Sequence, residues 1–503
     1  MLATIPSATL LGVEGRPVSV EVHVSGGLPG LTLIGLPDAA CRESRDRVRA
    51  ALISSGHDWV QRKVTVNLAP SGLRKTGGGL DLALALGLLL ASGSLPPDCL
   101  DDTAVLGELG LDGSVRRVAG TVALVDALDS ATVVVPAANA HEAGLVGRHR
   151  IRPVSTLVEL VAALRGTAPW PDPPGDPPPE TLPPEPDLAD VRGHPVARLA
   201  LEVAAAGAHH LLMVGPPGSG KTMLARRLPG ILPDLGVDEA LVATRVHSAA
   251  GLTLPPGGLV RRPPFRAPHH GASAVSIVGG GTAAMRPGEI SLASSGVLFL
   301  DELGEFPTPV LESLRQPLEE GIVRVSRARA AVAYPARFLL VAAMNPCPCG
   351  EGGAPGGCRC GDAARLRYAR RLSAPLLDRF DLRLEVTRPD VGDLLAGPPG
   401  EPTAAVADRV AAARERARGR GVRANADLPA TRLDDEAPLS GAAAVLLEDA
   451  LRAGRLSARG LHRVRRVART LADLGGRSGP LTDADVCLAL QLRAEPTLLA
   501  VAA

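Results

Sequence analysis

Apolar and polar positions alternate in short segments of the first third of this 503-residue chain. A period of two is typical of half-buried strands, and it predicts strands at 18–24 and 64–68, with a further strand at 132–135. A capping Asp38 predicts a helix to about residue 52, and an apolar helix is expected from about Leu80. We therefore predict that the first 165 residues form an independent α/β domain.

Past residue 188 the apolar runs become short and unbroken. Runs at 210–214, 297–300 and 338–343 are separated by longer segments, as expected for parallel strands buried on both faces. This spacing predicts a doubly wound parallel α/β sheet. From residue 403 the chain is rich in Ala, Arg and Leu at helical spacing, which predicts a helical region.

Two breaks divide these patterns. Ten of the eighteen residues at 169–186 are proline, so this segment is expected to be a stiff, extended linker. A weaker break, rich in glycine and proline, lies at 397–402. We therefore predict four parts: an N-terminal domain at 1–167, a linker at 168–187, a central domain at 188–402 and a helical region at 403–503.

The overall charge is close to zero, with 54 basic and 53 acidic side chains. Any nucleic acid or anionic surface must therefore be bound by a local patch. Lysine occurs only at Lys63, Lys75 and Lys221, and in a chain so rich in arginine a retained lysine is expected to be needed as an ammonium group. Since no signal peptide and no apolar run of bilayer length is found, we expect a soluble, cytoplasmic protein without membrane contact.

One motif carries the clearest chemistry. It follows a predicted strand and matches G-x-x-x-x-G-K-S/T, for which chance in this composition supplies only about 0.004 matches. Its backbone amides are suited to cradle phosphate groups, its lysine to reach the β- and γ-phosphate oxygens, and its threonine to ligate Mg²⁺. An ordinary glycine-rich turn is the alternative. The motif consists of Gly215, Pro216, Pro217, Gly218, Ser219, Gly220, Lys221 and Thr222.

Acidic and amide side chains follow the two other buried strands. Asp301 and Glu302 come after the strand at 297–300, where the first would hold Mg²⁺ and the second would polarise an attacking water. Taken alone, this pair could also cap the following helix. Asn345 follows the third strand and could orient the water, although a lone Asn there is more often a turn residue. With the phosphate motif, these residues predict ATP and Mg²⁺ as cofactors.

Four cysteines form two Cys-x-Cys pairs separated by eight residues. In a reducing compartment such thiolates favour a metal over disulfides, and they could close a tetrahedral Zn²⁺ site. Four free thiols are the alternative. Because the cluster follows Asn345 directly, a structural clamp is favoured over a catalytic role. The four are Cys347, Cys349, Cys358 and Cys360.

Together these residues resemble the AAA+ ATPases. The segments between them resemble the magnesium-chelatase-like group, and in particular the YifB/ComM family, over essentially the whole chain. Seven segments carry this resemblance: 265–270 (Phe-Arg-Ala-Pro-His-His), 287–291, 296–302, 343–349, 374–380, 35–38 and 42–44.

The resemblance implies a homo-oligomeric ATPase ring, expected to be a hexamer. It implies that Arg379 is the finger that a neighbouring subunit offers to the γ-phosphate. It also implies that Arg459 is a second-sensor arginine at the start of a helix in a C-terminal lid. Without the family, a surface salt bridge would be the better interpretation of Arg379.

The family also carries a β-hairpin before the first sensor. Residues 320–329 alternate apolar and basic side chains here, which places Arg324, Arg327 and Arg329 at a cationic hairpin tip. In a ring such arginines can track the phosphates of DNA in the pore. The alternative is a solvated edge strand guarded by charge.

The N-terminal domain resembles the proteolytic domain of Lon-type proteases, around 75–80 and 107–110. Gly79 stands where that family has its serine nucleophile, and Val122 where it has its lysine. Without a nucleophile and a base there is no acyl transfer. We therefore expect a degenerate scaffold, which disfavours an ATP-dependent protease.

These observations predict a Lon-like α/β domain, a central AAA+ P-loop sheet and a helical lid. The predicted function is ATP hydrolysis that moves DNA. The YifB/ComM resemblance implies a branch-migration helicase acting on branched or single-stranded DNA in recombination and natural transformation. The main alternative is a chelatase-type motor subunit that remodels a protein partner, and the fused Lon-like domain favours the first interpretation.

Overall fold

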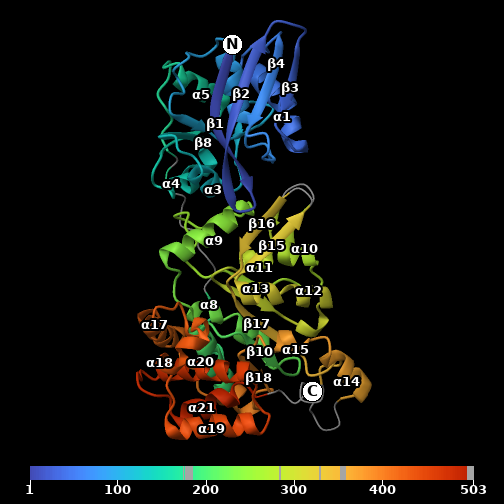
Figure 1. Ribbon diagram of the computed structural model, residues 1–503, viewed down its shortest axis with the longest axis vertical. Coiled ribbons are helices and arrows are strands. Elements are labelled where there is room, and N and C mark those ends of the chain that lie inside the picture. The colour runs from blue at the N-terminus through green and yellow to red at the C-terminus, as the bar shows by residue number, and fades with distance from the viewer. Residues whose placement is uncertain (174, 176–184, 282–284, 328–329, 352–357, 495–503) are drawn as a thin grey trace.

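The computed structural model describes residues 1–173, 175, 185–281, 285–327, 330–351 and 358–494. The N-terminal domain lies at one end of an elongated molecule, and the C-terminal helices lie at the other (Figure 1). Much of the predicted linker falls outside the described residues. Among the helices of the described ranges, none combines the length and apolar character that crossing a bilayer requires.

The N-terminal domain is built on a four-stranded sheet in the order β1-β2-β4-β3. The valines at 18, 20, 22 and 24 are all buried, because alternate residues of a strand face the same side. Asp38 caps α1 as predicted, since its carboxylate accepts a hydrogen bond from the Cys41 amide at 2.8 Å. These elements are β1 (Leu2–Leu11), β2 (Glu14–Ser25), β3 (Gly30–Ile34), α1 (Ala39–Ser54) and β4 (Lys63–Ala69).

A second sheet of three parallel strands, β5-β8-β9, completes this domain. Helix α2 is buried at nearly every position, which explains its apolar composition. The β6–β7 hairpin turns at Asp112-Gly113. The elements are α2 (Asp81–Ala91), β5 (Thr103–Val105), β6 (Glu108–Leu109), β7 (Val115–Arg116), α3 (Thr121–Asp126), β8 (Thr132–Pro136), α4 (Ala140–Gly144), β9 (Arg150–Val154) and α5 (Leu157–Leu164).

The central domain contains five parallel strands in the order β11-β14-β17-β10-β18, which confirms the predicted parallel sheet. Strands β10, β14 and β17 are buried at every position, because helices cover both faces of the sheet. The strands are β10 (Leu211–Val214), β11 (Phe265–Arg266), β14 (Val297–Leu300), β17 (Leu339–Met344) and β18 (Leu382–Glu385).

Helices and two short hairpins fill the connections of this sheet. The β15–β16 hairpin lies between α13 and β17 in the chain, and β12 pairs with β13. The elements are α6 (Pro195–Gly207), α7 (Lys221–Ala225), α8 (Leu228–Ile231), α9 (Val237–Ala249), α10 (Ala274–Val278), β12 (Gly279–Gly280), β13 (Arg286–Pro287), α11 (Glu289–Leu292), α12 (Thr308–Ser313), α13 (Arg315–Glu320), β15 (Ile322–Arg327), β16 (Ala330–Pro335), α14 (Asp362–Ala369), α15 (Ala374–Leu377) and α16 (Val391–Ala396).

The C-terminal region is helical in its described part, as its spacing predicts. Its apolar residues share one core with α6 and with one face of the parallel sheet. Helix α20 carries apolar and charged residues on opposite faces, and the apolar face is buried. The helices are α17 (Thr403–Gly419), α18 (Leu433–Glu436), α19 (Gly441–Arg452), α20 (Ala458–Leu474) and α21 (Asp483–Gln491).

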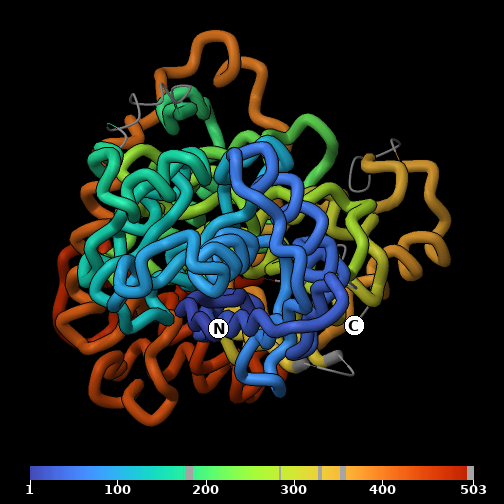
Figure 2. Tube along the Cα trace, turned by 90° about the horizontal axis from the view of Figure 1, so that it is seen from above, coloured from blue at the N-terminus to red at the C-terminus, as the bar shows by residue number. Residues whose placement is uncertain are grey.

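The N-terminal domain lies over the central domain along the long axis of the molecule (Figure 2). Helix α9 contacts α3, and the Gly120 amide donates to the Ser248 carbonyl at 2.9 Å. Arg245 of α9 pairs with Asp126 at 2.6 Å. The two domains are therefore held together by backbone and ionic contacts.

The turn between β1 and β2 meets the β15–β16 hairpin. Leu11 and Val13 pack against the apolar core that holds the inner face of this hairpin. Gly12 has a φ of +68°, and a Cβ there would collide with the side chain of Val332. Glycine is therefore needed at this turn for both its backbone conformation and the close approach.

Candidate functional site

The phosphate motif forms the loop between β10 and α7. Gly218 and Gly220 have φ values of +75° and +85°, a conformation that glycine adopts without strain. Lys221 begins α7 and folds back, so that its Nζ donates to the carbonyls of Gly215 at 2.7 Å and Pro216 at 2.9 Å. Burial lowers the pKa of Lys221. The loop thus presents one buried ammonium group and the N-terminus of a helix.

The sheet brings the other predicted residues to this loop. Thr222 Oγ1 donates to Asp301 Oδ2 at 2.7 Å, and Lys221 Nζ donates to Asn345 Oδ1 at 3.4 Å. Because β10 and β14 both run parallel to β17, the carboxyl ends of all three strands lie at one edge of the sheet. The hydroxyl and carboxylate oxygens of Thr222 and Asp301 are hard ligands of the kind that Mg²⁺ prefers.

Glu302 lies beside this cluster in an unusual conformation. Its φ of 52° is left-handed, which is rare for a residue with a side chain. Its Oε2 lies 2.9 Å from His270 Nδ1. The sequence indicated the segment at 265–270 only by resemblance and gave His270 no role. Its position could have been inferred, because His270 follows β11, the parallel neighbour of β14.

Arg379 lies at the opposite edge of the sheet from the phosphate loop. The Asp381 amide donates to the His210 carbonyl at 3.0 Å, just before β10 begins. Four residues of β10 separate that edge from the loop, a span of about 13 Å. The Arg379 side chain is 12% exposed and pairs with Glu319 of α13. The structure therefore does not bring Arg379 to the phosphate loop of its own chain.

Arg459 is exposed near the start of α20, on the same side of the molecule as Arg379. One turn further along α20, Arg463 donates to the Arg379 carbonyl at 3.1 Å and pairs with Asp381. Burial and the neighbouring charges of Arg463 and Arg459 lower the pKa of Arg379. The two arginines that the family resemblance singled out are thus close enough for their charges to interact.

This edge of the sheet contains a cavity of about 530 Å³ between the central domain and the C-terminal helices. Asp381 lies at its base and accepts hydrogen bonds from His209 and Arg463. Burial alone would raise the pKa of Asp381, but these partners hold it well below its ordinary value. Five arginines line the cavity: Arg337, Arg379, Arg423, Arg463 and Arg466.

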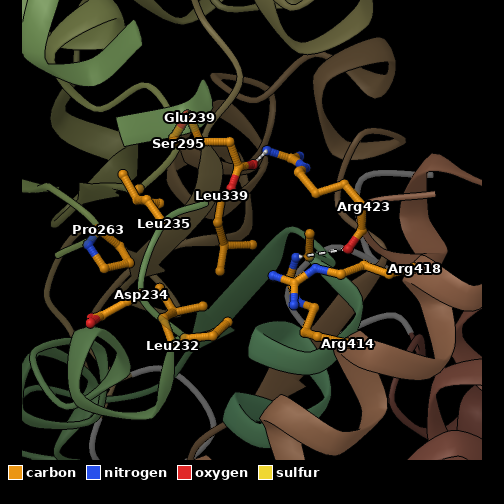
Figure 3. Close-up of a pocket in the computed structure, with 13 residues that line it drawn as sticks. Leu232, Asp234, Leu235, Glu239, Pro263, Ser295, Leu339, Arg414, Arg418 and Arg423 are labelled. Carbon is orange, nitrogen blue, oxygen red and sulfur yellow. Dashed lines mark hydrogen bonds and ion pairs between the residues drawn. The ribbon is translucent and has the colours of Figure 1, made fainter. Parts of the chain in front are cut away.

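A smaller cavity of about 50 Å³ adjoins it, where α17 packs on the same edge of the sheet (Figure 3). Arg414 and Arg418 of α17 and Arg423 converge there from one side, with Glu239 on the other. Arg414 donates to the Ala205 carbonyl at 2.6 and 2.9 Å, and burial lowers its pKa to about 10. The phosphate-loop edge and the arginine-rich edge are therefore distinct sites.

The four clustered cysteines converge after Asn345. Their sulfur atoms all lie within 4.8 Å of one another. The Sγ of Cys358 is 3.7 Å from those of Cys347 and Cys349, close to the S–S edge of about 3.8 Å in a tetrahedral site with Zn–S bonds of about 2.3 Å. A hydrogen bond from the Glu351 amide lowers the pKa of Cys349 to about 6. The donor set fits a thiolate-liganded metal.

The cysteine cluster also touches the phosphate loop. Gly350, in the turn after Cys349, has a φ of +85°, and a Cβ there would lie 2.6 Å from the Pro217 side chain. Arg388 links the two segments, because it donates to the Pro217 carbonyl at 3.4 Å and pairs with Glu351 at 2.9 Å. The shape of the cysteine turn therefore bears directly on the phosphate loop.

The predicted cationic segment forms an antiparallel hairpin of β15 and β16. Val323 and Val325 are buried, whereas Arg324 between them is exposed and pairs with Glu320. Arg327 is the last residue of β15. Arg329 lies outside the described residues.

Comparison with known protein families shows to which class of protein this fold and site belong. Residues 187–394 match the family described as magnesium chelatase, subunit ChlI, and 20–139 and 400–493 match two further parts of that subunit. With the phosphate loop and the strand-end residues described above, these matches define an AAA+ motor of the magnesium-chelatase-like type.

Three full-length relatives narrow this class. The chain is 47% identical over 496 residues to an uncharacterized protein of Mycobacterium tuberculosis, covering 97% of each chain. It is 45% identical to the uncharacterized protein YifB of Escherichia coli, over 94% of this chain and 93% of the relative. It is 42% identical to the competence protein ComM of Haemophilus influenzae, over 94% of each. The chain belongs to the YifB/ComM family.

The phosphate-loop edge generates a paired prediction. We expect Lys221→Ala to weaken ATP binding by about tenfold to a hundredfold, because it removes charge-assisted phosphate contacts. Glu302→Gln should keep ATP binding and lower the hydrolysis rate by about a hundredfold or more, because only the water-polarising carboxylate is lost. Fluorescent-nucleotide binding and phosphate release measure the two effects. Lys63→Ala, in β4 of the N-terminal domain, is the control, and equal loss of binding in both site variants would contradict the assignment.

Proposed function

We propose that this protein is an ATP-hydrolysing ring motor that moves DNA, acting as a branch-migration helicase on branched or single-stranded DNA. The β15–β16 hairpin carries this proposal. It presents the exposed Arg324 and leads directly into β17, at whose far end Asn345 contacts Lys221. A change at the nucleotide can therefore reach a cationic hairpin through one strand.

The nucleotide chemistry is assigned to the phosphate-loop edge. Lys221 and the loop amides would bind the phosphates of ATP, and Thr222 and Asp301 would hold Mg²⁺, whose charge would offset the negative charge on the γ-phosphate. Glu302 orients and polarises the attacking water, with Asn345 beside it. His270 holds the Glu302 carboxylate at 2.9 Å, so hydrolysis requires Glu302 to turn from His270 toward the water.

The arginine-rich edge is assigned to the nucleotide of a neighbouring subunit. Arg379 is about 13 Å from its own phosphate loop along β10, so a γ-phosphate contact needs a second copy of the chain. Arg459 shares that surface and acts there as the second sensor of the C-terminal lid. The γ-phosphate of the neighbour then competes with Glu319 for Arg379. A homo-hexameric ring provides this second copy at every site. Each subunit contributes its Arg379 to one neighbour and receives the Arg379 of the other neighbour.

DNA binding is assigned to the hairpin arginines Arg324, Arg327 and Arg329. The buried valines of β15 fix the hairpin to the core, and the alternation leaves Arg324 on the outer face. The kinship with a competence protein supports a role in DNA uptake and recombination. The match to a magnesium chelatase subunit supports one alternative to the DNA-moving function. In this alternative the protein is a chelatase-type motor that remodels a protein partner.

The cysteine cluster is assigned to structural Zn²⁺, held by Cys347, Cys349, Cys358 and Cys360. The metal would supply a rigid cross-link and no step of the reaction. Its position beside Pro217 makes it a clamp for the phosphate loop.

The N-terminal domain is assigned to a degenerate Lon-like fold without protease activity. Gly79 offers no nucleophile, and Val122 is buried in α3. Its remaining role is then structural or in ligand binding.

Arg379 gives a test of the ring. We expect Arg379→Ala to lower ATP hydrolysis by about a thousandfold, because a cation no longer stabilises the transition-state charge. Mixing it with Glu302→Gln protein should restore part of the activity, since some mixed interfaces contain both intact halves. Arg452→Ala, an exposed arginine of α19, should behave as the wild type. No recovery in rings that exchange subunits would reject the finger role.

The cysteines predict a metal content. Purified protein should contain about one zinc per chain by elemental analysis, and Cys347→Ser with Cys358→Ser should remove it. Because the turn contacts Pro217, metal loss should also weaken nucleotide binding several-fold. Cys99→Ser with Cys487→Ser, outside the cluster, should change neither property. Metal-free protein with four rapidly alkylated thiols would rule out the site.

The hairpin tests the DNA-moving function. Replacing Arg324, Arg327 and Arg329 by Gln should weaken DNA binding and lower its log–log salt slope by up to about three units. Four-way junction migration should stop while basal ATPase remains, because the nucleotide residues are untouched. A triple variant that migrates junctions at the wild-type rate would exclude the hairpin as the contact. Wild-type protein that binds no DNA would favour the chelatase-type alternative.

A further inference from the structure

A cavity of about 390 Å³ lies between the N-terminal and central domains. This volume is within the range of small-molecule and cofactor sites. The β1–β2 turn and the loop before α2 line it on one side, and Arg286 of β13 lines it on the other. The cavity is open to solvent at the border where the exposed Arg117 and Arg286 lie.

The loop before α2 presents backbone to this cavity. Gly77 has a φ of +80°, and a Cβ there would meet nothing within 4 Å. A Cβ at Gly78 would lie 2.7 Å from the Glu108 carboxylate, and one at Gly79 would lie 3.1 Å from Val118. Open space therefore lies beside Gly77, whereas Gly78 and Gly79, the position that corresponds to the Lon-type serine, pack closely against neighbouring side chains.

Cationic side chains dominate the charged lining of the cavity. Arg74, Arg117 and Arg286 line it with one carboxylate, Glu108, among the described residues. Arg117 is already paired with Glu142 at 3.5 Å. Arg74 and Arg286 have no ion pair within the part of the chain that the structure describes. Two arginines, one from each domain, therefore line the same space without an ion-pair partner among the described residues.

This lining matches the chemistry of a nucleoside phosphate. The planar fork of arginine binds phosphate oxygens through paired hydrogen bonds. Leu10, Leu80 and Leu124 supply an apolar wall against which a sugar or base can pack. A ligand with phosphate at one end and a flat apolar part at the other satisfies both features.

The cavity also borders the hairpin that the proposed function assigns to DNA. Leu11 and Gly12 line the cavity, and Gly12 packs against Val332 of β16. One turn of chain therefore separates the cavity from the hairpin. A strand that follows the hairpin needs only to cross this turn to reach Arg74 and Arg286.

We propose that this cavity, the interdomain cleft, binds the phosphodiester backbone of the nucleic acid strand that the hairpin engages, with Arg74 and Arg286 as its phosphate ligands. The proposal rests on the DNA-moving function proposed above. It gives the degenerate N-terminal domain a role, because one of the two phosphate ligands comes from that domain. A free nucleotide carries the same phosphate group, and the experiment below distinguishes binding of a free nucleotide from binding of a nucleic acid strand.

The test measures binding of fluorescently labelled oligothymidylate to the full-length protein by anisotropy across a range of salt. Each phosphate contact contributes about 0.7 to the log–log slope of a single strand, so Arg74→Gln with Arg286→Gln should lower the slope by about 1.4. Arg74→Lys with Arg286→Lys should keep most of it, because the charge remains. Arg62→Gln with Arg452→Gln, two exposed arginines outside the cleft, is the matched control and should leave the slope unchanged. Basal ATPase should be the same in all of these proteins.

An unchanged slope in the Arg74→Gln, Arg286→Gln protein, with wild-type thermal unfolding, would overturn the cleft proposal even where the hairpin variant loses DNA. Labelled thymidine monophosphate provides the second arm. If it binds and is lost in the double variant while the oligonucleotide slope is unchanged, the cleft takes a free nucleotide and the strand proposal is wrong. These two outcomes can be distinguished from failure of the proposed DNA-moving function. If that function is wrong, the wild-type protein binds no oligonucleotide at any salt concentration.

Discussion

The parallel pairing of β10 and β14 with β17 is the constraint on which the rest of the central domain depends. Parallel strands give a sheet two chemically different edges, and each of these three strands is followed at its carboxyl end by a residue of the candidate site. Asp301 and Asn345 are distant in sequence from Lys221 and Thr222, yet hydrogen bonds of 2.7 and 3.4 Å connect the four residues in two pairs. Reversal of any one strand would move its residue to the other edge and dismantle the site.

The opposite edge is organised around a buried charge. Asp381 accepts hydrogen bonds from His209 and Arg463, and His209 Nε2 lies 2.8 Å from the Thr470 hydroxyl of α20. An unpaired carboxylate at this depth would be strongly destabilising, so these partners hold α20 against the sheet at Arg463 and Thr470. The same network sets the position of Arg379 and of the arginine-rich cavity. In the proposed ring, the rigidity of this edge lets one subunit present a finger to another.

The N-terminal domain contacts the central domain on two sides. Arg245 pairs with Asp126 on one side, and Gly12 packs against Val332 on the other. Since β16 leads by way of a short connection to β17, the strand that ends at the phosphate-loop edge is continuous with the hairpin on which the turn between β1 and β2 packs. The same turn lines the interdomain cleft, so a ligand bound in the cleft would lie next to the hairpin.

The sequence by itself determined the features that depend on neighbouring residues. The phosphate loop, the buried strands, the Asp38 cap of α1 and the alternation of β15 follow from local spacing, because backbone geometry repeats every few residues. Tertiary structure decided the rest. The contacts of Glu302 with His270, of Arg379 with Glu319 and of Gly12 with Val332 join segments that only folding brings together. No local period encodes such pairs, because their partners are chosen by the order and direction of strands in the sheet and by the packing of whole domains.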